Sequence, residues 1–333
     1  MARPGEFELI ARYLAPLASD PAARGLIDDA AVLSPSADKD LVLTKDALAA
    51  GIHFFADDDP GLIARKALRV NISDLAAKGA APTGYLLALA LPSDWTEDWI
   101  AAFTTGLKAD QERYGCSLLG GDTIRSADGL MISITAIGEV PREAMVPRAG
   151  ASAGDIIFVS GTIGDAGLGL VLRGDPARAG DFDLSRSDAE RLVGRYLLPE
   201  PRVALAPVLR DHVRAAMDVS DGLAGDIGHM CRAGGVAAQI RIDDVPLSDP
   251  FRRALAADPS LRTRAVCGGD DYEIVCAVAP ENEAAFRKAA EKTGIPVAAI
   301  GRFLDGAASG NAPVFVDGDG RPVDLGGTSF AHF

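Results

Sequence analysis

The hydrophobic positions along the first 140 residues follow two periods, one of about 3.6 residues and one of two. Phe7, Ile10 and Leu14, for example, recur at the spacing of one helix face, whereas residues 130–140 alternate as a half-buried strand does. Pro60 stands where a helix would begin, because proline is tolerated in the first helical turn. The pattern predicts helices over residues 5–17, 62–79 and 95–114, and strands over 41–44, 86–91 and 130–140.

The regular pattern is interrupted between residues 141 and 154, where prolines and glycines cluster. A chain of 333 residues is also longer than one hydrophobic core usually supports, which favours two domains. We therefore predict an N-terminal domain over residues 1–141 and a C-terminal domain over residues 150–333. The second domain is predicted to contain a polar loop over 173–187, a helix-rich stretch over 189–214, a strand that ends at Asp218, and strands near 155–161, 236–242, 273–278 and 314–316.

Helices and strands intermix in this pattern without the strict strand-helix-strand rhythm of a doubly wound parallel sheet. An α+β fold with mixed sheets is therefore favoured over a Rossmann fold. No repeat with a period of about 20–50 residues is visible.

Composition narrows the classes of function. Hydrophobic residues make up 48% of the chain, which is ample for globular folding, and the formal net charge is −14. Because no basic stripe offsets that charge, nucleic acid and membrane surfaces are not expected as partners. No apolar run approaches the roughly 18–20 residues that span a bilayer, and the acidic start, with Glu6 and Glu8, differs from a signal peptide. The four cysteines form no CxxC pair, so a soluble cytoplasmic protein with reduced thiols is predicted.

Short acidic segments recur at widely separated points of the chain. Several follow strand-like runs or stand beside Gly, Ser or Thr. Carboxylates that folding brings together repel one another and are costly to desolvate unless cations neutralise them. Mg²⁺ is the usual partner of such groups, and it typically joins one or two carboxylates to substrate phosphates. A magnesium-phosphate site is therefore predicted from segments 27–30, 44–46, 71–74, 120–123, 218–222 and 268–273.

Each acidic residue also has an ordinary structural explanation. Asp28, Asp29 or Asp122 could be a helix cap or close an Asx-turn. Asp74 is harder to explain in this way, since Asp is unfavourable in the middle of an apolar helix. The Gly-rich turn over 160–167 could present backbone N–H groups to an anion or simply join a strand to a helix. His53 could be a hydrogen-bonded core residue or a substrate contact.

Taken in order, these motifs resemble the bacterial thiamine-monophosphate kinase family, which shares its acidic loops with the wider aminoimidazole-ribonucleotide (AIR) synthetase superfamily. The resemblance covers nearly the whole chain, whereas no P-loop lysine motif or protein-kinase His-Arg-Asp set is present. The matching segments are Gly5-Glu6-Phe7, Asp28-Asp29-Ala30, Gly51-Ile52-His53-Phe54, Lys66-Ala67, Asn71-Ile72-Ser73-Asp74-Leu75-Ala76, Gly120-Gly121-Asp122-Thr123, Asp218-Val219-Ser220-Asp221-Gly222-Leu223, Gly268-Gly269-Asp270-Asp271-Tyr272-Glu273 and the closing Phe330-Ala331-His332-Phe333.

The resemblance implies an N-terminal sheet domain that pairs with a second copy to form a dimer barrel, followed by a C-terminal α/β domain. It also implies transfer of the γ-phosphoryl group of ATP to thiamine monophosphate, giving thiamine diphosphate. The residues carried over as ligands of several Mg²⁺ ions are Asp29, Thr44, Asp46, Asp74, Asp122, Asp218 and Asp221. Those expected at ATP are Gly121, Asp122, Arg148 and Ser220, and those expected at the thiamine moiety are His53, Asp270 and Phe330.

The chain departs from the family pattern at two positions. Ile27 stands where glycine often precedes the Asp pair, and Lys45 stands where threonine is usual, at a position associated with metal. A lysine ammonium cannot ligate Mg²⁺. Three alternatives follow: the backbone carbonyl serves there, the ammonium replaces a cation beside phosphate, or the side chain faces solvent.

The predicted reaction needs no catalytic base, because the acceptor phosphate is already anionic at neutral pH. No catalytic side chain is therefore assigned. Two alternatives remain at this level. One is another ATP-using member of the superfamily, disfavoured because no reactive cysteine lies near either end of the chain. The other is a catalytically silent nucleotide-binding regulator, suggested chiefly by Lys45.

Overall fold

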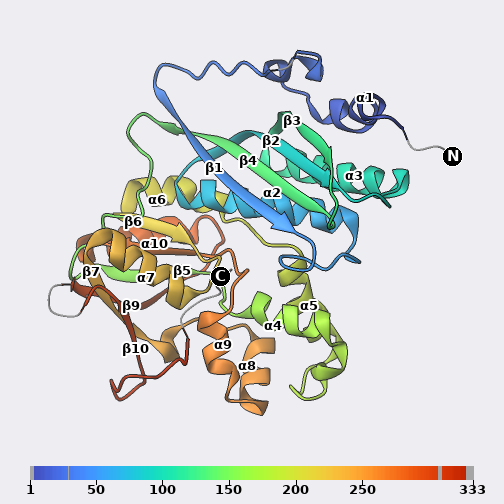
Figure 1. Ribbon diagram of the computed structural model, residues 1–333. Helices are drawn as coiled ribbons and strands as arrows, with labels where there is room; N and C mark the ends of the chain where they lie inside the picture. Colours follow the sequence, from blue (N-terminus) through green and yellow to red (C-terminus); the bar gives the residue numbers. More distant parts are fainter. Residues whose placement is uncertain (1–3, 29, 307–309, 328–333) are drawn as a thin grey trace. The chain divides into compact units, whose positions relative to one another are not determined.

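The computed structural model describes residues 4–28, 30–306 and 310–327, and the chain divides into two units (Figure 1). The N-terminal unit comprises Met1–Leu75 and Ala80–Ala144, and the C-terminal unit comprises Ala76–Gly79 and Met145–Phe333. The main division therefore falls within the interval in which prolines and glycines interrupt the sequence pattern. Among the described residues, no helix combines the length and the apolar character that crossing a membrane requires.

The N-terminal unit is built around a four-stranded sheet of order β1-β4-β2-β3, in which only the β2/β3 pair is parallel. The elements of this unit are α1 (Glu6–Leu9), η1 (Ile10–Leu14), η2 (Ala15–Leu17), η3 (Pro21–Leu26), β1 (Lys39–Ala49), α2 (Pro60–Ala77), β2 (Ala81–Leu91), α3 (Glu97–Tyr114), β3 (Ser117–Arg125) and β4 (Met131–Pro141). Helix α3 is capped at its start by Thr96, whose hydroxyl accepts from the Trp99 N–H, and at its end by the left-handed Gly115.

The two faces of this sheet differ in burial. Helices α2 and α3 cover one face (Figure 1), where residues such as Leu48, Leu89 and Ile134 are buried. The other face is called the outer face below, and it carries exposed apolar side chains. The exposed fractions there include Leu43 61%, Leu86 39%, Ile124 54% and Met131 43%.

The C-terminal unit contains a six-stranded mixed sheet of order β10-β7-β9-β5-β8-β6, in which β10 and β7 are parallel. Its elements are β5 (Ile156–Ser160), α4 (Asp165–Gly174), η4 (Pro176–Ala179), α5 (Arg186–Leu197), η5 (Val203–Leu205), α6 (Ala206–His212), β6 (Ala215–Asp218), α7 (Leu223–Gly234), β7 (Val236–Arg241), η6 (Ile242–Asp244), α8 (Asp249–Ala257), α9 (Leu261–Cys267), β8 (Ile274–Val278), η7 (Pro280–Asn282), α10 (Glu283–Glu291), β9 (Val297–Asp305) and β10 (Pro313–Val316).

Helices pack on both faces of this second sheet. In β5, Ile157 and Val159 join the core formed with α4, α7, α8 and α9, whereas Ile156 and Phe158 join the core formed with α6 and α10. Because successive side chains of a strand point to opposite faces, a strand buried on both sides is apolar throughout, as β5 is. The two mixed sheets with their helices confirm the predicted α+β class.

Two details of the predicted elements were wrong. The predicted helix over 5–17 changes from α to π to 3-10 geometry, because Pro16 lacks an N–H and obstructs a regular helix. Asp46 and segment 120–123 were expected in loops, but they lie within β1 and β3. Cross-strand pairing, which continues through Ala49 in β1 and Arg125 in β3, extends both strands beyond their apolar runs.

Candidate functional site

Strand β1 and helix α2 are joined by polar contacts at the predicted acidic residues of the N-terminal unit. The Thr44 hydroxyl donates a short hydrogen bond to the Asp74 carboxylate. The Asp46 N–H donates to Asn71 Oδ1 at 3.1 Å, and Asn71 Nδ2 donates to the Ala67 carbonyl at 3.0 Å. Asn71 is fully buried and Asp74 is half-buried. The structure therefore brings Thr44, Asp46 and Asp74 together.

Lys45 lies on the other face of the same strand. Its ammonium donates a short hydrogen bond to the Ser133 hydroxyl on β4, and the side chain is exposed. Thr44 and Asp46, one residue away on either side, contact α2 instead. The ammonium of Lys45 is thus directed away from the Asp74 carboxylate, and of the three alternatives raised by the sequence this geometry favours a solvent-facing lysine.

His53 follows β1 in a turn. Its Nδ1 atom accepts a hydrogen bond from the Ala49 N–H at 3.1 Å, so the neutral ring carries its proton on Nε2. The His53 carbonyl accepts from the buried Lys66 ammonium at 3.0 Å. These contacts fix the turn and the orientation of the imidazole.

A pocket of about 810 Å³ brings the first and fourth acidic segments together within the N-terminal unit. Asp28 and Ala30 line it from one side, and residues 120–123 of β3 line it from another. Apolar side chains such as Phe7 and Leu86 supply much of the remaining wall. At Gly121 a side chain is excluded, because a Cβ atom would lie 1.9 Å from the Leu87 carbonyl oxygen. The pocket has the size and the mixed lining of a small-molecule site.

Asp122 is exposed and lies on the outer face. It pairs in register with Ala88, which pairs with Ser133, which in turn pairs with Ala47. Residues in one such row point to the same face of a sheet, so the Asp122 side chain is on the face opposite α2 and Asp74. Two other expected site residues, Asp29 and Phe330, lie outside the described residues.

In the C-terminal unit, the loop after β6 carries Asp218, Ser220 and Asp221. The N–H groups of Ser220 and Asp221 both donate to the Asp226 carboxylate, at 3.0 and 3.2 Å. Asp226 is 1% exposed, and burial, followed by the Asp221 charge, raises the pKa of its carboxyl to about 7. The Arg148 guanidinium acts in the opposite direction and lowers the pKa of Asp226, so Arg148 lies near this loop.

The segment 268–273 is tied to that loop. The Asp270 N–H donates to the Ser220 carbonyl and the Tyr272 N–H donates to the Val219 carbonyl, both at 2.8 Å. Asp270 and Tyr272 have φ values of 72° and 50°, which non-glycine residues rarely adopt. Such strain persists only where the surroundings hold it and is concentrated at functional sites.

Two buried carboxylates hold this segment in place. Asp271, which is completely buried, accepts from the Gly164 N–H at 2.7 Å and from the Ala166 N–H at 3.3 Å. In the turn over 160–167, the N–H groups of Gly164 and Ala166 are therefore bonded to a side chain of the protein itself. Burial raises the pKa of Asp271 well above its usual range, while these two N–H groups act to lower it.

Glu273 is the centre of a buried ion-pair network. Its carboxylate accepts from the Ser160 hydroxyl at 2.6 Å, from Arg195 at 3.0 Å and from Arg202 Nε at 2.7 Å. Arg195 also donates to the Asp271 carbonyl at 3.0 Å. Removing one partner of such a network leaves buried charge uncompensated, so the network fixes the backbone on both sides of Tyr272.

The sequence pattern did not single out Asp226, and it quoted Asp271 and Glu273 without a role. Asp226 lies in the first turn of α7, where an aspartate is common, so the local pattern gave no signal that could have found it. Within the described residues, no three His, Cys, Asp or Glu side chains converge on one metal position. Thr44, Asp46 and Asp74 form one group beside α2, and the loop with Asp218 and Asp221 carries a second group in the C-terminal unit, whereas Asp28 and Asp122 lie apart from the first group at the 810 Å³ pocket.

Comparison with known proteins places the chain. It matches the family model "AIR synthase related protein, N-terminal domain" over residues 27–140 and the corresponding C-terminal domain model over residues 152–310. It is 43% identical over 329 residues to thiamine-monophosphate kinase of Caulobacter vibrioides, covering 98% of this chain and 91% of that protein.

Two solved structures are also similar. Thiamine-monophosphate kinase from Stenotrophomonas maltophilia superposes with a TM-score of 0.83 at 40% identity, covering 96% of this chain and 98% of that one. AaThiL complexed with AMPPCP and TMP superposes with a TM-score of 0.76 at 30% identity, covering 100% and 99%. Fold and site thus define a two-domain AIR-synthase-related protein. Within that class, the chain belongs to the thiamine-monophosphate kinase family, which confirms the resemblance inferred from its motifs.

Proposed function

We propose that this chain transfers the γ-phosphoryl group of ATP to thiamine monophosphate, giving thiamine diphosphate in thiamine biosynthesis. The observation that carries the proposal is similarity over essentially the full chain to thiamine-monophosphate kinases, including the AaThiL complex with AMPPCP and TMP. The acceptor is a phosphate oxygen that is already anionic at neutral pH. The protein therefore has to hold the two negatively charged substrates in line for the transfer, and no general base is needed to remove a proton from the acceptor.

The donor chemistry of both acidic groups fits Mg²⁺. Thr44, Asp46, Asp74, Asp218 and Asp221 offer only hard oxygen ligands. Among the described residues, the half-buried Asp74 and Asp221 have no ion-pair partner, although isolated carboxylates in such positions are costly. When bound, Mg²⁺ neutralises the repulsion between the two substrates. The protein's part is to hold its carboxylates in fixed positions, through Thr44 and Asn71 on one group and through Asp226 on the other.

The substrate contacts are assigned by position. Gly121 lies in the 810 Å³ pocket, where the close approach of the backbone and the apolar wall suit a nucleotide base. Arg148 and Ser220 are assigned to the phosphates of ATP, because arginine forms strong hydrogen bonds with phosphate and Ser220 lies in the loop that carries the acidic residues. His53, Asp270 in its strained segment and Phe330 are assigned to the thiamine moiety.

A homodimer completes this proposal. Asp46 on β1 and Gly121 on β3 lie in one row of the sheet, separated by Ile134 and Leu87. Three strand spacings of about 4.8 Å put them about 14 Å apart, too far for Asp46 and Asp122 of one chain to share an ion. Strands β1 and β3 are the two edges of the sheet, and unpaired edges are prone to pair with another chain.

Pairing of β3 with β1 of a second copy would join the two sheets edge to edge, with Asp122 and Asp46 still on opposite faces of the joined sheet. The exposed apolar side chains Leu43, Leu86, Ile124 and Met131 would be covered in the same step, as the dimer barrel expected from the sequence requires.

The four free cysteines suit a reducing compartment, and we assign the protein to the cytoplasm on that basis.

The test of the reaction is direct. Purified protein with ATP, MgCl₂ and thiamine monophosphate should form thiamine diphosphate and ADP in equal amounts, and a variant with both Asp46 and Asp74 changed to Asn should form neither. ATP binding without product would instead support the silent regulator, and formation of ADP without thiamine diphosphate would mean that the acceptor is wrong.

A further inference from the structure

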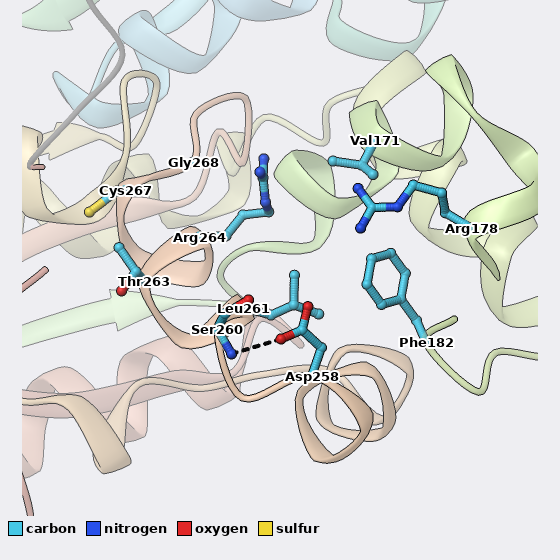
Figure 2. Close-up of a pocket in the computed structure, with 10 residues that line it drawn as sticks. All are labelled: Val171, Arg178, Phe182, Asp258, Ser260, Leu261, Thr263, Arg264, Cys267 and Gly268. Carbon is cyan, nitrogen blue, oxygen red and sulfur yellow. Dashed lines mark hydrogen bonds between the residues drawn. The ribbon is translucent and has the colours of Figure 1, made fainter. Parts of the chain in front are cut away.

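A separate cavity of about 380 Å³ lies in the C-terminal unit, between η4 and the helices α4 and α9 (Figure 2). Two arginines reach it from different elements, Arg178 from η4 and Arg264 from α9. None of the residues assigned to the phosphoryl-transfer site lines this cavity.

The charge of the cavity is unbalanced. The Arg264 guanidinium has no hydrogen-bond or ion-pair partner among the residues that the structure describes. Arg178 approaches Asp181 only to 3.8 Å, and the two side chains are 42% and 70% exposed, so this pair is weak. Asp258 is the acidic residue of the lining, and its carboxylate already accepts the Ser260 N–H at 2.9 Å, the dashed contact in Figure 2. Two guanidinium groups therefore face one carboxylate that is already engaged.

The cavity also has an apolar wall. Phe182 and Leu261 are 1% and 4% exposed, and both line it together with Val171. The guanidinium carbon of Arg178 lies 4.9 Å from the centre of the Phe182 ring, a cation–π contact that orders the arginine before any ligand arrives. An ordered guanidinium loses less entropy when it binds an anion. Anionic and apolar parts of one small molecule would both find partners here.

The cavity adjoins the acidic loops of the same unit. The Arg264 carbonyl accepts the Gly268 N–H at 2.9 Å, and a Cβ on Gly268 would lie 2.7 Å from that carbonyl oxygen. On the next residue, a Cβ of Gly269 would lie 2.5 Å from the Ser220 carbonyl oxygen. The two glycines that follow α9 are thus in close contact with the Arg264 carbonyl and the Ser220 carbonyl. The chain continues from them directly into Asp270.

We propose that this cavity binds a phosphate monoester of an apolar or aromatic alcohol, and that its occupancy restrains segment 268–273. A phosphate group carries a charge of about −1.5 to −2 at neutral pH and three acceptor oxygens, which suits two guanidinium groups better than a carboxylate does. The proposal does not depend on the reaction assigned to the protein.

Binding can be located and measured with 4-bromophenyl phosphate, in protein whose nucleotide site is filled with ADP. We expect anomalous bromine density in the cavity, beside Phe182. Arg264→Ala should weaken binding at least tenfold in calorimetry. Arg262→Ala is the matched control on the same helix, because Arg262 pairs with Asp243 at 2.8 Å instead, and it should bind as the wild type does.

Each of the following results would overturn the proposal. Bromine density only outside the cavity, or equal affinity in wild type and Arg264→Ala, would remove the site. Binding of 4-bromobenzoate or inorganic phosphate as tight as that of the aryl phosphate would contradict the assigned ligand class. When the probe is bound, hydrogen exchange of residues 268–273 should become slower in the wild type and in Arg262→Ala, but not in Arg264→Ala. Exchange that is unchanged in all three proteins would refute the proposed restraint of this segment.

Discussion

Lys45 and Asp46 are neighbours in β1, yet their side chains leave opposite faces of the sheet. The Asp46 N–H bonds to Asn71 on α2, with Thr44 and Asp74 beside it, whereas the Lys45 ammonium bonds to Ser133 on the outer face. Strand alternation alone produces this separation. A lysine can therefore occupy the position at which the family usually has threonine without placing its charge against the Asp74 carboxylate.

Lys45→Thr should accordingly leave the Mg²⁺ concentration for half-maximal rate unchanged. The lost contact is a hydrogen bond between a partly exposed pair, worth about 0.5–1.5 kcal/mol of stability at most. Measuring the rate against free Mg²⁺ for both proteins decides the matter. A curve displaced several-fold to higher Mg²⁺ would show that the ammonium does substitute for part of a metal's charge.

Asp74→Asn should lower turnover by at least the roughly 10–100-fold seen when groups around a bound metal are changed. The amide keeps the size of the side chain and can still accept from Thr44, so the melting temperature should change little. Asp128→Asn, at an exposed position of the same unit, is the control and should be silent. Wild-type turnover in Asp74→Asn would remove this residue from the mechanism.

The local sequence pattern predicted the elements whose hydrophobic periodicity is strong. It failed where contacts between residues far apart in the sequence determine the structure. Asp74 could be recognised because a mid-helix aspartate conflicts with its apolar neighbours. The strand position of Asp46 could not, because residues 44–46 are polar and only their pairing with β4 holds them extended. For the turn over 160–167 the sequence left open an anion site or a plain strand-to-helix turn, and it could not show that the turn's N–H groups bond to Asp271, more than a hundred residues later.

Asp271 is predicted to be a positioning residue for Asp270. Asp271→Asn retains one acceptor but sets an amide N–H against a backbone N–H at Gly164 or Ala166, a loss of about 1–3 kcal/mol in a buried site. Segment 268–273 should loosen, so the KM for thiamine monophosphate should rise about tenfold while the KM for ATP stays within twofold. Steady-state kinetics with each substrate varied in turn measures both.

Asp165→Asn is the matched control for that experiment. Asp165 is equally buried at the start of α4, but it accepts from the hydroxyls of Thr162 and Ser248 and does not touch segment 268–273 through these bonds. Both variants should unfold at lower temperature, and only Asp271→Asn should change the KM. An equal rise in KM in the two variants would mean that lost stability, and not the position of Asp270, explains the effect.

The pH dependence of stability gives an independent measurement on Asp271. Its pKa in the folded protein is raised by burial, so the folded state holds the proton more tightly than the unfolded chain, whose aspartates titrate near pH 3.9. The stability that this group contributes is therefore fully present below about pH 4 and is lost as the pH rises through the raised value. The free energy of unfolding of the wild type, relative to Asp271→Asn, should fall between about pH 4 and pH 8 in urea titrations. A difference that grew with pH over this range would show that the two backbone N–H groups outweigh burial and hold Asp271 as a carboxylate.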